Sequence, residues 1–195
     1  MNYSSKLSFS LVFMVLFFSC ARKTVTRVSP EQQIDLSGNW NDTDSRLVAE
    51  EMTKDMINRP WREAFNQKFN KKPVMIVGII TNKSHEHIEA ETFIKDIEKE
   101  LINTATVRVV QNAEFREKLR EERADQQQFA SLETAKKWGK ELGADYMLFG
   151  TINSIVDQEG AKKVVFYQIN LELTDLETNE IVWLGDKKIK KFVKN

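Results

Sequence analysis

The stretch Lys163-Val-Val-Phe-Tyr-Gln-Ile-Asn-Leu-Glu-Leu-Thr174 decides the fold, because apolar and polar side chains alternate along it. Apolar or aromatic side chains stand at 165, 167, 169, 171 and 173, and polar ones stand at 168, 170 and 172. A period of two residues is that of a strand with one buried face. Glu177-Thr178-Asn179 follows as a turn, and Ile181–Val193 is expected to pair back as a hairpin.

Upstream segments extend this hairpin to a mixed sheet. Pro73–Ile80 is a continuous apolar run, short and rich in β-branched residues, which favours a strand buried on both faces. Val107–Val110 and Ala144–Ile155 are further strands, and Asp157–Gly160 is expected to be the turn into the hairpin. The predicted fold class is α/β (α+β): one small domain over residues 34–195, with a mixed four- to five-stranded sheet and helices packed on it. Helices are expected on both faces near the early strands.

Apolar stripes with a spacing of three or four residues predict the helices. The predicted helices cover residues 44–58, 61–70, 89–102, a segment that follows Asn112, and 132–142. Thr43 and Asp44 are candidate N-caps of the first helix, and Asn112 can cap the fourth. Pro60 either ends the first helix or opens the second at its first turn. Residues 121–128 are highly polar and form either a solvated helix end or a loop.

Composition and charge exclude several classes of protein. The chain has 195 residues, of which 41% are hydrophobic, with 29 basic and 29 acidic side chains. This length and apolar fraction suit one domain plus a tail. The net charge of zero argues against a nucleic-acid partner, because such proteins normally carry a strong basic excess. The single cysteine excludes an internal disulfide and a thiolate zinc cluster.

Residues 1–19 have the pattern of a signal peptide. A short polar segment with one lysine, Lys6, precedes the uncharged and largely apolar run Leu7–Phe18. As a helix this run reaches ~18 Å, which is too short to cross a hydrocarbon core of ~30 Å. Leu16-Phe17-Phe18-Ser19-Cys20 resembles a bacterial lipobox, at which a peptidase cuts before a cysteine that carries lipid. The alternative is an ordinary secretory signal with an incidental cysteine.

Lipidation at Cys20 would anchor the mature chain to a membrane. The thiol and the new N-terminal amine can take acyl chains such as palmitate, and each buried CH₂ contributes ~0.8 kcal/mol of membrane affinity. Residues 20–33 are then the lipidated N-terminus and a short tether, of which residues 21–33 span at most ~43 Å. No acidic residue stands in Ala21-Arg22-Lys23. For lipoproteins of this type that pattern points to the outer membrane, with the domain facing the periplasm.

No set of residues in the sequence supports catalysis. No serine stands in a G-x-S-x-G frame, and neither of the phosphate-loop patterns GxxxxGKS/T and GxGxxG occurs. His85-Glu86-His87 offers two histidines at best to a metal, and the domain has no further histidine or cysteine. A polar loop is therefore expected there. The chain is expected not to be an enzyme, and to have no metal, cofactor or small-molecule substrate.

One further stretch carries a family resemblance. Leu36-Ser-Gly-Asn-Trp-Asn-Asp-Thr-Asp-Ser45, continued by Arg46-Leu-Val-Ala-Glu-Glu-Met52 and by Asn58-Arg-Pro-Trp61, closely resembles the signature of the LpoB family. Leu142-Gly-Ala-Asp-Tyr-Met-Leu-Phe-Gly150 and the stretch from Tyr167 to Trp183 agree with it. The resemblance covers residues 34–193, and the best-known members have a longer tether.

The resemblance implies a compact α/β domain on a lipid anchor, similar to the amino-terminal domain of TolB. Such a protein would bind a class A penicillin-binding protein and stimulate glycan polymerisation and cross-linking. It would act as a regulator, by binding the active conformer of the synthase more tightly. The alternative is a structural or secretion-associated envelope lipoprotein of the curli type, whose fold is similar.

Two groups of residues are candidates for partner binding. The first is Trp40, Asn41 and Asp42 in the signature stretch. Trp40 is either an aromatic anchor at an interface or a core residue next to a helix cap.

The second group is Lys187, Lys188 and Lys190, in a lysine-rich last strand that also holds Lys191 and Lys194. These lysines either guard an edge strand against pairing with other chains, or form a basic face for an acidic partner or an anionic lipid.

Overall fold

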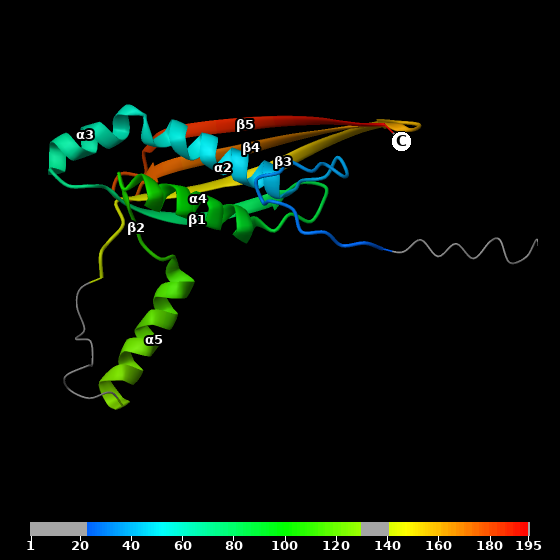
Figure 1. Ribbon diagram of the computed structural model, residues 1–195. Helices are drawn as coiled ribbons and strands as arrows, with labels where there is room; N and C mark the ends of the chain where they lie inside the picture. Colours follow the sequence, from blue (N-terminus) through cyan, green and yellow to red (C-terminus); the bar gives the residue numbers. More distant parts are fainter. Residues whose placement is uncertain (1–22, 130–140, 195) are drawn as a thin grey trace, which may run out of the picture. The chain divides into compact units, whose positions relative to one another are not determined.

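The computed structural model describes residues 23–129 and 141–194 (Figure 1). The described residues before Gln33 belong to a separate unit from the domain that begins there. The signal peptide, Cys20 and nearly all of the helix predicted over 132–142 lie outside the described residues. Among the helices that the structure describes, none is long and apolar enough to cross a membrane.

The domain is built on a five-stranded sheet with the strand order β2-β1-β3-β4-β5. The strands are β1 (Val74–Lys83), β2 (Arg108–Val109), β3 (Tyr146–Glu159), β4 (Lys162–Asp175) and β5 (Ile181–Lys194). β1 runs parallel to β2 and β3, whereas β3, β4 and β5 are antiparallel neighbours. The predicted mixed sheet and the α+β class are therefore confirmed.

The turn between β3 and β4 differs from its prediction. β3 continues through Glu159, so the connection is the two-residue turn Gly160-Ala161 and not Asp157–Gly160. Gly160 has a φ of 55°, and two-residue hairpin turns require such positive angles. The longer strands carry this hairpin well beyond the helices (Figure 1).

Within the described residues the structure has four helices: α2 (Asp42–Ile57), α3 (Pro60–Phe69), α4 (Ala90–Thr104) and α5 (Ala113–Phe129). Pro60 occupies the first turn of α3, so the second of its two interpretations is correct. Asn112 accepts a hydrogen bond from the Phe115 N–H at 3.1 Å, as predicted for a cap. Residues 121–128 are helical and not a loop.

The core lies on the face of β4 that the sequence alternation predicts. Each of the residues 165, 167, 169, 171 and 173 is 2% exposed or less. The apolar stripes of α2 and α4 close over this face, with Val48, Met52, Met56, Phe93, Ile97 and Leu101 buried. Burying one such side chain contributes about 1.5–3 kcal/mol, so this layer supplies most of the driving force for folding.

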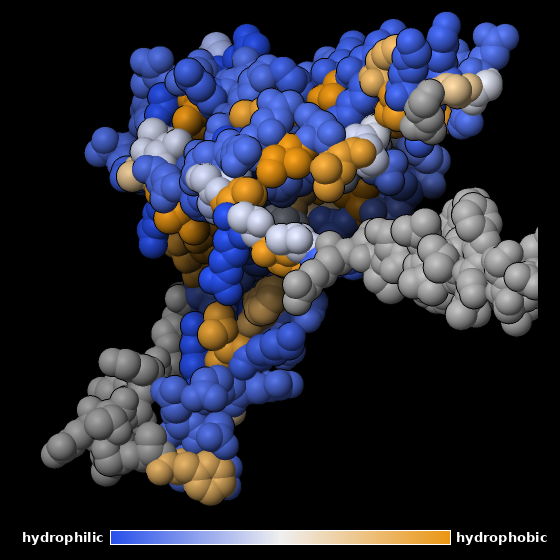
Figure 2. Space-filling model, turned by 45° about the vertical axis from the view of Figure 1, so that its right-hand side comes forward, coloured by the Kyte–Doolittle hydropathy of each residue, from blue (hydrophilic) through white to orange (hydrophobic). Residues whose placement is uncertain are grey.

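The opposite face of β3, β4 and β5 carries no helix in the part of the chain that the structure describes (Figure 1). Ile155, Leu184 and Phe192 on this side are 63–67% exposed. The sequence predicted helices on both faces only near the early strands, so this open face of β3, β4 and β5 does not contradict that prediction. β1 does have two buried faces, because Val74–Val77 are all 5% exposed or less. In Figure 2, hydrophobic residues accordingly reach the surface in several places between hydrophilic ones.

Candidate partner-binding site

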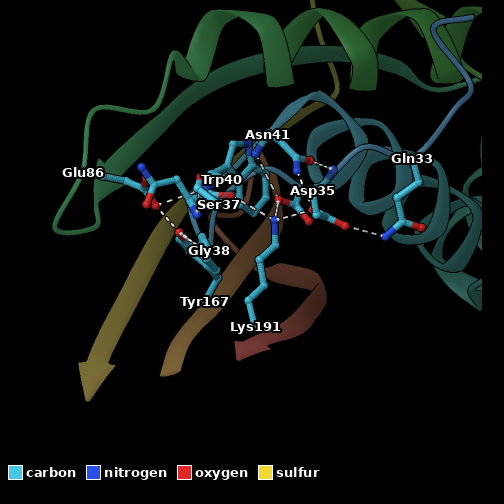
Figure 3. A network of polar contacts seen from close by, with 11 residues as sticks. Gln33, Asp35, Ser37, Gly38, Trp40, Asn41, Glu86, Tyr167 and Lys191 are labelled. Carbon is cyan, nitrogen blue, oxygen red and sulfur yellow. Dashed lines mark hydrogen bonds and ion pairs between the residues drawn. The ribbon is translucent and has the colours of Figure 1, made fainter. Parts of the chain in front are cut away.

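The segment Asp35–Asn41, called here the N-terminal strap, lies on the buried side of β4 and β5 (Figure 3). A Cβ atom on Gly38 would come within 2.5 Å of Val193 Cγ2, so only glycine allows the backbone to approach this closely. Trp40 packs edge-on against Phe93 and Tyr167, with ring centroids 6.2 and 5.6 Å apart. The strap thus reaches the core through buried Gly38 and half-buried Trp40, whereas its other residues before Asn41 are exposed.

Lys191 of β5 ties the strap to the sheet. Its Nζ donates to the carbonyl of Asn39 at 3.0 Å and forms ion pairs with Asp35 at 3.2 Å and Asp44 at 2.5 Å. Only 13% of the Lys191 side chain and 11% of the Asp44 side chain are exposed. Pairs at this depth are screened less by water than surface pairs, so their loss costs more.

The strap ends in the N-cap of α2. The Asn41 side chain accepts from the Asp44 N–H at 3.1 Å, and the Asp44 carboxylate accepts from the Asn41 N–H at 3.0 Å. This reciprocal capping box makes Asn41 the N-cap, and not Thr43 or Asp44 as the sequence suggested. The Asp44 carboxylate therefore both caps the start of α2 and forms the ion pair with Lys191.

Asp35 at the other end of the strap is a hydrogen-bond acceptor for three side chains. The hydrogen bonds from Gln33, Asn41 and Lys191, in this order of effect, lower the pKa of Asp35 below its usual range. Its carboxylate is thus stabilised in the charged form that the Lys191 ion pair needs.

Tyr167 and Glu86 hold the middle of the strap. The Tyr167 hydroxyl lies within hydrogen-bond distance of the Gly38 carbonyl, at 3.1 Å, and of the Glu86 carboxylate. Glu86 also accepts from the Trp40 N–H at 3.2 Å. Burial and then the bond to Glu86 raise the pKa of Tyr167 well above its ordinary value of 10.0. The phenol is therefore a neutral donor at any physiological pH.

The His85-Glu86-His87 stretch lies in the connection after β1. His85 stacks on Tyr167 with ring centroids 6.4 Å apart, and its Nδ1 lies 2.6 Å from the Ser154 hydroxyl. Across residues 23–129 and 141–194, no three His, Cys, Asp or Glu side chains are grouped so that they could hold a metal ion. Within this stretch, Glu86 is the residue that holds the strap, through Trp40 and Tyr167. The sequence pattern drew attention only to the two histidines beside it.

The two predicted groups occupy different surroundings. The side chain of Trp40 packs on the core and that of Asn41 caps α2, so both hold the strap in place. Asp42 is exposed at the start of α2. Lys187 forms an ion pair with Glu51 of α2.

Lys188 and Lys190 lie on the other face of β5 and are exposed. Lys188 is 3.1 Å from Asp186, whereas Lys190 has no ion pair with any residue that the structure describes. The lysine of β5 that contacts the strap is Lys191, which was not among the three lysines predicted to bind a partner. Its position two residues after Ile189, on the buried face of the strand, could have indicated this.

Replacing Lys191 by methionine is expected to lower the free energy of unfolding by about 2 kcal/mol, between the values for exposed and buried ion pairs. Asp35 and Asp44 would lose their shared cation. Lys190→Met is the matched control, because the neighbouring side chain is exposed and unpaired among the described residues. Urea denaturation of both variants measures the difference, and equal losses would refute the role given to Lys191.

Tyr167→Phe is expected to change the alkaline stability profile. Unfolded tyrosine ionises near pH 10, whereas folded Tyr167 stays protonated, so the unfolded state binds fewer protons above pH 10. The stability given by Tyr167 is thus complete below pH 10 and falls above it by at most about 1.4 kcal/mol per pH unit. Unfolding free energies of both proteins from pH 7 to 12 test this, and parallel curves above pH 10 would contradict it.

The chain is similar to a known protein family and to several solved structures. A family model described as the peptidoglycan-synthase activator LpoB matches residues 44–189. The LpoB C-terminal domain from Escherichia coli is 15% identical, with a TM-score of 0.44 over 76% of this chain and 99% of that chain. The corresponding Salmonella enterica domain is 14% identical, with a TM-score of 0.43 over the same shares.

The NMR structure of E. coli LpoB is 12% identical, with a TM-score of 0.42 over 92% of this chain and 87% of that chain. No curated protein sequence matches the chain. The family model spans the helices α2 to α5 and nearly all of the sheet. The chain therefore belongs to the LpoB family.

Proposed function

We propose that this chain is a lipid-anchored periplasmic regulator that binds a class A penicillin-binding protein and stimulates peptidoglycan synthesis. The observation that carries the proposal is the match of the synthase-activator family over residues 44–189. The domain itself supplies a binding surface and no chemistry. Its action is a population shift: it favours the active conformer of the synthase by binding that conformer more tightly, and the gain cannot exceed the difference in affinity.

The structure supports a preformed binding surface. Trp40 and Asn41 hold the strap and the start of α2 in place, which presents Asp42 at the surface. Lys188 and Lys190 project from β5 on the opposite face of the sheet. The backbone that carries these residues is fixed in the helix start and the strand, so little backbone entropy is lost on binding, which favours affinity.

The synthase activity test uses the mature chain from Cys20 onward and the class A penicillin-binding protein of the same organism. The rate of lipid II polymerisation is expected to rise severalfold and to saturate as the chain is added, because the active conformer is a finite population. The heat-denatured chain is the control for unspecific effects. An unchanged rate with an otherwise active synthase would remove the proposed activity and leave the family assignment intact.

The anchor is tested separately. The chain expressed with residues 1–19 is expected in the membrane fraction, with an intact mass that includes acyl chains on Cys20, because two or three chains hold a protein firmly in a bilayer. Cys20→Ser should move it to the soluble periplasmic fraction. A mature protein that starts with an unmodified Cys20 would exclude lipidation.

A further inference from the structure

β5 is an open edge of the sheet. It is the outermost strand in the order β2-β1-β3-β4-β5, and 13 of its 14 residues pair with β4, the exception being Val182 at a register shift. In an antiparallel strand, alternate residues direct their N–H and C=O groups away from the neighbour. Those groups of β5 have no strand partner among the described residues, and an edge of this length can template an added strand.

Helix α2 runs alongside this edge in the direction opposite to β5 (Figure 1). Three contacts define the alignment: Asp44 with Lys191, Glu51 with Lys187, and Asp55 Oδ2 with Trp183 Nε1 at 2.9 Å. Two hollows of about 550 and 560 Å³ lie between the helix and the strand, and both are lined by Glu51 and Lys54. The two adjacent hollows are together called here the α2–β5 groove.

The groove offers accessible apolar surface in its first hollow. Leu47 of α2, 46% exposed, and half-buried Ile189 line the first hollow. The second hollow is lined by Trp183, which is 6% exposed and whose ring lies against Gly185, where the missing side chain leaves room for it. Charged side chains of α2 stand along the rim, so apolar contacts in the groove would be bordered by polar ones.

The other face of β5 bears lysines that lack acidic neighbours on β4. In the register of the two strands, Lys188 lies beside Gln168, Lys190 beside Phe166 and Lys194 beside Lys162. The one carboxylate that meets any of these lysines in the described chain is Asp186, on the same strand as Lys188. A strand added to the free side of β5 would place its own side chains next to them, and opposite charges across strands are favourable.

We propose that the α2–β5 groove binds an extended acidic segment of a partner protein, which joins the sheet as a sixth strand. Alternate acidic residues of this segment lie beside Lys188 and Lys190, and the intervening apolar residues contact Leu47 and Ile189. Backbone hydrogen bonds to the edge supply affinity, and the alternate side chains supply selectivity, as in other strand-addition complexes. The proposal is independent of whether the partner is a synthase.

A second copy of this chain suits the groove less well. Pairing of β5 with another β5 would bring lysines of the two strands together on the same face, and like charges across strands are destabilising. The lysines that discourage self-association are thus the ones that select an acidic strand.

The test uses the full mature chain and a short capped peptide that alternates glutamate and valine, with a peptide that alternates lysine and valine as its control. Calorimetry is expected to show saturable binding of the acidic peptide alone. Hydrogen exchange of the amides of residues 181–194 is expected to slow when it binds. Binding of both peptides alike, of neither, or slower exchange elsewhere but not in β5 would overturn the proposal.

Charge reversal tests the role of the two lysines. The double variant Lys188→Glu/Lys190→Glu should bind the acidic peptide ~10-fold more weakly, because two favourable cross-strand pairs become unfavourable. The matched control Lys68→Glu/Lys99→Glu makes the same change of net charge at exposed positions of α3 and α4 and should leave binding unchanged. Equal effects of both double variants would mean unspecific charge attraction. A dimer of the free chain with β5 already protected would assign the groove to a second copy.

Discussion

The burial of one face of β4 is the constraint on which the rest of the structure depends. β4 lies between β3 and β5, and its inward side chains at 165–173 are almost completely excluded from water. A shift of one residue in either pairing would turn this apolar row to the solvent, so the register of both neighbours is fixed. The helices α2 and α4 and the N-terminal strap then have a single apolar surface on which to pack.

Much of this architecture is present in local sequence patterns. The alternation in β4, the turn at 177–179 and the stripes of α2 and α4 each follow from periodicity, and the structure confirms them. The burial on both faces predicted for the early strand at 73–80 is confirmed at Val74–Val77 of β1. That burial does not extend across β3, β4 and β5, and no local pattern says how far along a sheet a covering layer reaches.

The candidate site was less predictable, because its contacts join distant parts of the chain. Asn-Asp-Thr-Asp at 41–44 offers several side chains that can cap a helix, and the choice of Asn41 goes with the use of Asp44 by Lys191. These two residues are 147 positions apart. Glu86 is likewise defined by Tyr167 and Trp40, and not by the histidines on either side of it. The sequence contains the correct residue types without indicating which of them meet.

The N-terminal strap also determines how the domain would bear mechanical load. If lipid on Cys20 holds the chain, as proposed above, a pull along residues 21–32 enters the domain at Gln33, directly before the strap. Lys191 binds the strap through Asp35 and Asn39, and it binds the start of α2 through Asp44. Several contacts would therefore share the force, and no single one would carry it alone. These contacts would thus hold the strap against a pull along the chain. Because Lys191 belongs to β5 and Asp44 to α2, a force on the strap would pass into both elements through this one cluster of contacts.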